Sequence, residues 1–211
     1  MTGGTEAPVE AAERPRLSLR FSARDLLRVA IFAVIFIVVT YVIGMLGILS
    51  PLVWLLIVPV QAIVGGVVVM LFLTRVGHAG PLALFGLVVA LFYLLSGNTV
   101  LSTAVILVLA VLAELLLWAG RYRSRWAAIW AYTLFGLSFF TPFLPLVLDR
   151  EAYFATSSWT EMGEDYVRAS DALLSAPVIG ALAGGILVAA FLGGLLGSAI
   201  LRKHFVRAGL A

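Results

Sequence analysis

The chain has 211 residues, of which 63% are hydrophobic and only 12% are charged, and its mean hydropathy is +1.12. This composition leaves too little polar surface to coat a soluble domain of this length. The net charge is +3, but the arginines cluster beside the ends of hydrophobic runs, which argues against nucleic-acid binding. The absence of cysteine excludes disulfides, thiol catalysis and cysteine-ligated metals.

The first 22 residues differ from the rest of the chain. Residues 1–22 are polar, contain Pro and Arg, and lack an apolar core before a small-residue cleavage site. They are therefore predicted to be a disordered cytoplasmic tail, not a signal peptide. Residues 23–211 are predicted to form a single membrane domain.

Long stretches without Asp, Glu, Lys or Arg fill most of that domain, at residues 29–49, 50–74, 76–113, 126–148 and 172–201. A bilayer core of roughly 30 Å requires about 20 apolar residues of helix, so these runs are long enough to span it. Turn-forming Gly, Pro, Ser and Asn divide them further. The sequence predicts an all-α protein with six transmembrane helices at about 26–46, 52–73, 80–96, 99–119, 126–147 and 177–201.

The charges between the runs fix the orientation. If all six runs span the membrane, twelve of the fourteen basic residues fall on one side, which is the cytoplasmic side by the positive-inside rule. Arg150 and Arg168 are the other two, and they share the 148–176 connection with six carboxylates. Removing the span at 80–96 would place basic segments outside. Both termini are therefore predicted to be cytoplasmic, and the 148–176 connection to face outward.

Small residues give the last span one nearly flat face. They recur at every fourth position, at Ala181, Gly185, Ala189, Gly193 and Gly197. In lipid, helices associate through close backbone approach, so this face must meet another helix. Packing within the bundle and a sliding contact with a separate subunit both remain open, and Gly65-Gly66 in the second span has the same two explanations.

Glu114 is the only formally charged residue well inside a predicted span, about two turns before Arg121. Burying a carboxylate costs several kcal/mol unless it is paired. The sequence therefore predicts a structural ion pair with an arginine such as Arg121, with partner coupling and proton relay as alternatives. His78 and His204 fall in cytoplasmic segments, where they are expected to face solvent or lipid headgroups.

Catalytic motifs are missing. There is no HExxH metal motif, no phosphate-binding glycine loop, and no serine and histidine on facing spans. We expect a protein that is not an enzyme and that uses no cofactor and no metal.

Polar and aromatic residues gather toward the outer ends of the spans, as a small-molecule site requires. The candidates for substrate binding are Trp54, Gln61, Tyr93, Asn98, Thr99, Thr141, Tyr153 and Trp159. An interfacial aromatic belt is the alternative explanation for the Trp and Tyr residues, and an interhelical hydrogen bond is the alternative for Gln61. Because the 148–176 connection is long and rich in aromatic residues, we expect it to be a lid over an outward cavity.

Several segments in order resemble the substrate-capture (S) components of energy-coupling factor transporters, specifically the treponemal and streptococcal-type group often labelled MptD-like. The similarity runs from about Leu19 to the C-terminus. It rests on YVIGMLG (41–47), MLFLTRV (70–76), SGNT (96–99), GRYRS (120–124), REAYF (150–154) and RKHFVRAG (202–209).

The resemblance implies a multi-pass protein of the bacterial plasma membrane that binds a vitamin, its precursor or another micronutrient outside. It also implies partners, namely a transmembrane scaffold subunit and two cytoplasmic ATPases that hydrolyse ATP. Such subunits often dock through Ala-x-x-x-Ala on the first helix; here Ala30 is followed at that spacing by Val34, with Ala33 one position early. An autonomous secondary transporter or channel is the alternative function, and a non-transporting assembly or sensor subunit is a third.

Overall fold

The computed structural model describes residues 21–207, with side chains as far as Arg202. Within this range every regular element is helical, which confirms the predicted all-α class. The predicted tail lies outside the described residues except for Phe21 and Ser22, and so does the side chain of His204. The α-helices are α1 (Ala23–Met45), α2 (Pro51–Leu73), α3 (Pro81–Leu95), α4 (Val100–Ala119), α5 (Arg125–Gly136), α6 (Leu144–Leu148), α7 (Arg150–Phe154), α8 (Ser157–Thr160), α9 (Glu164–Leu173) and α10 (Ala176–Arg207).

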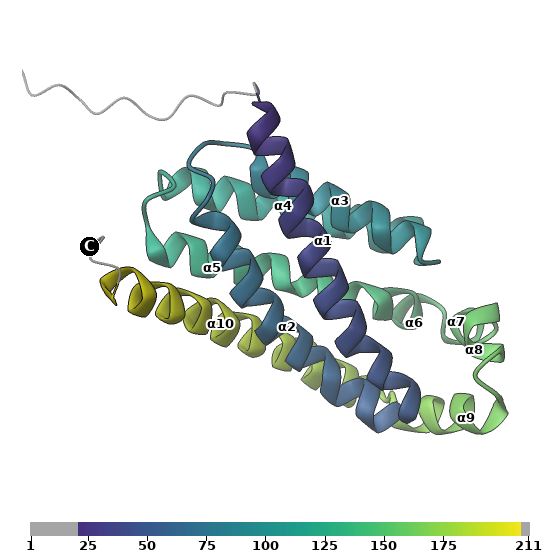
Figure 1. Cartoon of the computed structure of the whole chain (residues 1–211). Coiled ribbons are helices and arrows are strands. Elements are labelled where there is room, and N and C mark those ends of the chain that lie inside the picture. Colours follow the sequence, from purple (N-terminus) through teal and green to yellow (C-terminus); the bar gives the residue numbers. More distant parts are fainter. Residues whose placement is uncertain (1–20, 208–211) are drawn as a thin grey trace, which may run out of the picture.

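Six apolar segments run back and forth along the bundle (Figure 1). Five are long and apolar enough to cross a membrane, namely Ala23–Leu49, Pro51–Leu73, Val100–Ala119, Arg125–Leu148 and Ala176–Arg202. Helix α3 has 15 residues, which at 1.5 Å per residue gives about 22 Å, short of a hydrocarbon core of about 30 Å. The predicted multi-pass membrane protein is confirmed, with five helices of spanning length and α3 as a shorter apolar helix among the described residues.

Local sequence explains where the helices begin. Ser50, Thr99 and Ser124 are extended at their N-cap positions, and each side-chain oxygen accepts a hydrogen bond from the amide three residues later. Such a cap satisfies one of the amides that a helix start leaves without a partner. Pro51 and Pro81 occupy first-turn positions, where a missing N–H costs nothing.

Phenylalanine rings fill the centre of the bundle. Phe85 stacks on Phe72 with ring centroids 5.1 Å apart, and it meets the edge of Phe36 at 5.4 Å. These rings come from α1, α2 and α3, and Phe135 of α5 completes the cluster at 5.9 Å from Phe85. Outward-facing Leu, Ile and Val side chains leave the periphery apolar, as contact with lipid requires.

Helix α10 lies along α2, and glycines bring the two backbones together. A Cβ at Gly193 would lie 2.6 Å from the Ile63 carbonyl oxygen, and one at Gly197 would lie 2.8 Å from Met70 Cβ. The small-residue face thus packs within the bundle along this part of α10, and Gly66 faces Gly193 from the other side. Gly184 and Gly185, in the outer half of the helix, have open space where a Cβ would stand.

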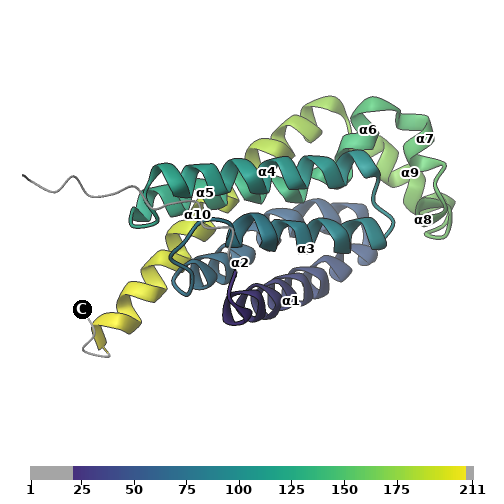
Figure 2. The same ribbon diagram turned by 90° about the horizontal axis from the view of Figure 1, so that it is seen from above.

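The segment after α5 is irregular. It continues as a 3-10 helix over Leu137–Phe143 before α6. Pro142 and Pro145 remove backbone donors there, which weakens a regular α-helical ladder. The chain then enters α7, α8 and α9, which form a small helical layer, here called the lid (residues 149–175). The lid lies at the end of the bundle away from the C-terminal end of α10 (Figures 1 and 2).

Candidate outer binding site

A cavity of about 910 Å³ lies between the lid and the ends of the membrane helices and is called here the outer chamber. Five of the predicted binding residues line it: Trp54, Asn98, Thr99, Tyr153 and Trp159. Helix α2, the α3–α4 turn and the lid supply these side chains. The volume falls within the usual range of small-molecule sites.

A second cavity of about 270 Å³, the inner chamber, extends toward the middle of the bundle. Gln61 and Tyr93 line it, and Asn98 lines both chambers. Gly44, Ile48 and Ser96 also belong to both linings, so the two chambers adjoin. Together they form a recess that begins under the lid and reaches the level of Gln61.

Gln61 combines a structural contact with access to the inner chamber. Its Nε2 donates to the Thr40 carbonyl oxygen of α1 at 2.6 Å, so the interhelical hydrogen bond considered from the sequence is present. The residue is only half-buried and remains part of the chamber wall. The carboxamide therefore has further hydrogen-bonding capacity available to a ligand.

Asn98 and Thr99 shape the turn that borders both chambers. Asn98 Nδ2 donates to the Tyr93 carbonyl oxygen at 3.1 Å, at the end of α3. Thr99 Oγ1 accepts from the Ser102 amide at 3.2 Å and caps α4. Both side chains fix the backbone at the rim of the recess in addition to lining it.

Thr141 is the one predicted binding residue that lines neither chamber. It is buried behind the wall, where its Oγ1 donates to the Ser138 carbonyl oxygen at 2.7 Å. Its own carbonyl oxygen accepts from Ser102 Oγ at 2.7 Å. The 3-10 segment turns this side chain inward, so Thr141 supports the wall of the recess from behind.

An aromatic cluster joins the lid to the bundle. Trp54 stacks on Phe143 with centroids 4.5 Å apart, and its edge meets Trp159 of the lid at 5.5 Å. Tyr153 and Phe154 pack on the same indole, at 5.3 and 4.9 Å. Trp159 is only 8% exposed. These contacts place Trp54 and Trp159 in a packed cluster at the chamber, which a lipid-facing belt would not require.

Two polar contacts hold the lid in place. Tyr166 Oη donates to the Gly47 carbonyl oxygen at 2.8 Å, which ties α9 to the turn between α1 and α2. Arg150 joins the two ends of the lid, since its Nε donates to Asp171 Oδ1 at 2.6 Å and its Nη1 to the Leu174 carbonyl oxygen at 2.7 Å. Burial raises the pKa of Tyr153 and of Tyr166, so both phenols stay neutral near pH 7.

Tyr166 and Asp149 belong to the chamber wall but were not selected from the sequence. Both lie in the 148–176 connection, whose length and aromatic content predicted a lid. Which lid residues turn inward depends on the short helices α7 to α9, whose boundaries apolar periodicity does not reveal.

At the opposite end of the bundle, Glu114 is held by backbone amides. The side chain is 7% exposed. Its Oε1 accepts from the Gly80 amide at 2.9 Å, and its Oε2 accepts from the Leu82 and Ala83 amides at 2.8 and 3.0 Å. A carboxylate at a helix N-terminus also interacts favourably with the helix dipole. Glu114 thus caps α3 from another helix.

The predicted ion pair between Glu114 and Arg121 is not formed. Tyr122 Oη donates to Glu114 Oε1 instead, and none of the ion pairs among the described residues involves Glu114. Arg121 and Tyr122 both adopt positive φ, at 53° and 56°, which is uncommon for residues with a side chain. Burial and the contact with Glu114 raise the pKa of Tyr122, so this phenol remains a donor.

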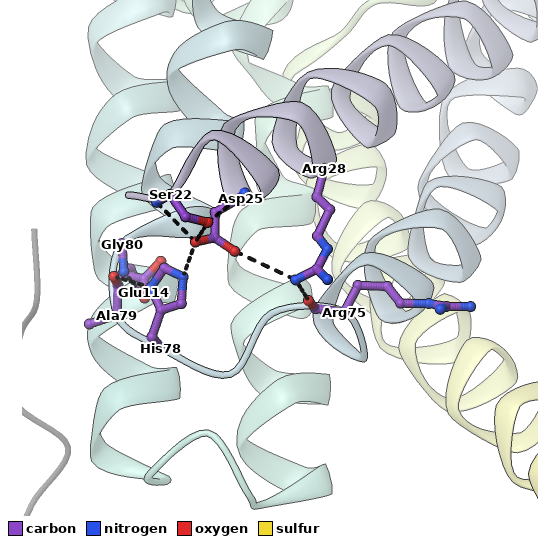
Figure 3. A network of polar contacts seen from close by, with 8 residues as sticks. All are labelled: Ser22, Asp25, Arg28, Arg75, His78, Ala79, Gly80 and Glu114. Atoms are coloured by element: carbon purple, nitrogen blue, oxygen red, sulfur yellow. Dashed lines mark hydrogen bonds and ion pairs between the residues drawn. The ribbon is translucent and has the colours of Figure 1, made fainter. Parts of the chain in front are cut away.

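A polar network links the start of α1 to the α2–α3 loop (Figure 3). Asp25 Oδ2 lies 3.3 Å from His78 Nε2, and Arg28 Nη1 donates to the Arg75 carbonyl oxygen at 3.0 Å. The His78 Nδ1 lies 3.1 Å from the Ala79 carbonyl oxygen. His78 thus contacts Asp25 of α1, and its side chain remains 32% exposed.

The three candidate docking residues on α1 differ in exposure. Ala30 is exposed, and Val34, one turn later, is 55% exposed on the same side. Ala33 is 0% exposed and packs in the core. Ala33 therefore lies at the buried edge of this face, and only Ala30 and Val34 are exposed.

The described residues contain no group of three or more His, Cys, Asp or Glu side chains arranged to hold a metal ion. The arrangement at the outer end offers instead aromatic surface, hydroxyls and carboxamides around a covered recess. Such a lining binds and orients a small molecule by stacking and hydrogen bonding.

These features define a multi-pass integral membrane protein with a lidded recess at one end of its bundle. The chain belongs to the Trep_Strep family of hypothetical bacterial integral membrane proteins, whose model matches residues 23–207. The predicted membership of the treponemal and streptococcal-type group and the bacterial membrane location are thereby confirmed. No curated protein and no solved structure matches the chain.

Proposed function

We propose that this protein is the substrate-capture subunit of an energy-coupling factor importer, which binds a micronutrient such as a vitamin or vitamin precursor from outside. The observation that carries the proposal is the outer chamber of about 910 Å³ beneath the lid. Arg150 joins the two ends of the lid, and Tyr166 binds it to the turn between α1 and α2. A covered recess on the side facing away from the basic segments suits capture from the exterior.

Separate chains supply the energy in this proposal. The sequence has no phosphate-binding glycine loop, so ATP hydrolysis falls to two cytoplasmic ATPases that act through a transmembrane scaffold subunit. This chain performs no catalytic step and needs no cofactor. The exposed apolar face of α1 around Ala30 and Val34 is the proposed docking surface for the scaffold.

The alternative of an autonomous proton-coupled carrier is less well supported. A proton relay requires a carboxylate that exchanges partners or meets water. Glu114, the intramembrane carboxylate, is committed to three amides and the Tyr122 hydroxyl. It is better suited to hold α3 and α4 together than to carry protons.

Gentle extraction followed by native mass spectrometry tests the capture function. We expect the purified protein to retain a small molecule, and Trp159→Ala to lose it because the lid loses its central aromatic contact. Trp126→Ala is the matched control, since Trp126 is exposed at the start of α5 and lines neither chamber. Retention of the molecule by Trp159→Ala, or its loss from both variants alike, would contradict the assignment of the site.

The same preparation tests the partners. Val34→Trp should reduce co-purification of a scaffold and ATPases without affecting ligand retention, because a bulky ring prevents close helix approach. Val188→Trp is the control, as Val188 is equally exposed on α10. Uptake into liposomes should require the added scaffold and ATPases, and efficient uptake by the isolated chain would overturn the proposal.

A further inference from the structure

The charges around the recess indicate which kind of molecule it takes. This inference rests on the proposed function, because it concerns the ligand of the same outer site. Among the described residues that line the two chambers, none is Lys, Arg or His. Asp149 is the one formally charged residue in the lining. A carboxylate or phosphate ligand would find no cationic partner there and would be repelled by Asp149.

The segment that forms the lid is negatively charged as a whole. Between residues 148 and 176 six carboxylates stand against two arginines, a net charge of −4. Arg150 does not face the chamber, because its guanidinium is engaged by Asp171 and by the Leu174 carbonyl oxygen. Arg168 is 75% exposed and lies beside Asp165 at 3.6 Å. A net negative charge on the lid attracts cations toward this end of the molecule and repels anions.

The walls suit a cation that carries a ring. Three aromatic residues of the outer chamber, Trp54, Tyr153 and Tyr166, surround a fourth, Trp159, with ring centroids 5.3 to 6.1 Å from its own. Tryptophan and tyrosine faces attract ammonium and ring cations through the negative charge of their π-systems. We propose that the recess binds a positively charged, ring-containing small molecule, and that Asp149 and the aromatic cluster select its charge.

Asp149 can be neutralised without unfolding the lid. Its Oδ1 accepts from the Ala152 amide at 2.9 Å and caps α7. Asparagine is an equally good N-cap and retains this oxygen, so Asp149→Asn removes the charge alone. Glu161→Gln is the matched control, because Glu161 is an exposed lid carboxylate that lines neither chamber.

Three pyridine compounds of similar size separate charge from shape: 1-methylnicotinamide is a cation, nicotinamide is neutral and nicotinate is an anion. We expect titration of tryptophan fluorescence to give tightest binding for the cation, by about fivefold over the neutral compound, as for one ion pair with a solvent-exposed carboxylate. Nicotinate should bind most weakly. Asp149→Asn should remove most of the preference, Glu161→Gln should keep it, and high salt should reduce it.

Equal or tighter binding of nicotinate would overturn the charge inference while leaving the capture function standing. So would equal effects of Asp149→Asn and Glu161→Gln. If none of the three compounds binds, the charge of the molecule retained in native mass spectrometry decides: a cation supports the inference, and an anion overturns it. The absence of both binding and a retained molecule would instead overturn the capture function itself, and this inference with it.

Discussion

At the scale of single residues, Glu114 shows how a membrane protein accommodates a buried carboxylate without an arginine. Gly80 is the N-cap residue of α3, with φ 108°, and has no side chain to cap the helix, and Pro81 has no N–H. The free amides of Gly80, Leu82 and Ala83 all converge on the Glu114 carboxylate. The desolvation cost of the charge is thus offset by several charge-assisted hydrogen bonds.

Replacing Glu114 with Gln should therefore lower the free energy of unfolding by about 3 kcal/mol. The glutamine NH₂ group cannot accept a hydrogen bond, so one or two of the three backbone amides would lose their acceptor. Thermal unfolding in detergent checks this expectation. Glu161→Gln, on the exposed surface of the lid, should leave the midpoint unchanged. A Glu114→Gln protein as stable as wild type would show that the carboxylate does not hold α3.

The partner of Glu114 also shows where sequence reasoning ends. The cost of burying a carboxylate was readable from the sequence, and it predicted that Glu114 must be satisfied. The sequence did not reveal that helix-start amides more than 30 positions earlier would satisfy it, because every residue except proline carries such a donor. The same limit applies to Thr141, whose direction depends on the geometry of a 3-10 segment.

At the scale of elements, α10 carries two kinds of small-residue surface. Around Gly193 the backbones of α10 and α2 approach so closely that a Cβ would lie 2.6 Å from the Ile63 carbonyl oxygen. Around Gly184 nothing stands within 4 Å of a Cβ position. The four-residue period identified the helix as a packing helix, but it did not distinguish these two halves.

Gly193→Ala should therefore destabilise the bundle by about 1–3 kcal/mol through overpacking against α2. Gly184→Ala should be neutral or slightly stabilising, since alanine favours a helix and has room at this position. Thermal unfolding of the two variants in the same detergent makes the comparison. Similar midpoints for both would contradict the close contact between α10 and α2.

At the scale of the whole molecule, hydrophobic runs and charge placement were sufficient to predict the architecture. The structure has its apolar helices within a few residues of the predicted spans, because the bilayer imposes both their length and their polarity. The short α3 was predicted from the balance of charge on the two sides more than from its own hydropathy. The residues that line the two chambers were predicted in part, since the ends of the spans are readable from the sequence and the direction of each side chain is not.

Cysteine labelling tests this arrangement directly, because the chain has no cysteine of its own. Cysteines introduced at Ser96 and Ser158 should react with a membrane-impermeant reagent added outside intact cells, and a cysteine at Gly77 should react only after lysis. All three positions are exposed. If α3 did not cross the membrane, the cysteines at Ser96 and Gly77 would react from the same side.

Arg150, in the first turn of α7, is bonded to Asp171 and to the Leu174 carbonyl oxygen, and this determines how the lid can move. It joins the two ends of residues 150–174, so we expect α7, α8 and α9 to move as one unit once the Tyr166 hydroxyl releases the Gly47 carbonyl oxygen and Trp159 separates from Trp54. A lid that opens without unfolding its helices does not lose conformational entropy each time it closes. Opening of the lid then requires breaking the Tyr166 hydrogen bond and the contact of Trp159 with Trp54, while the three short helices stay intact.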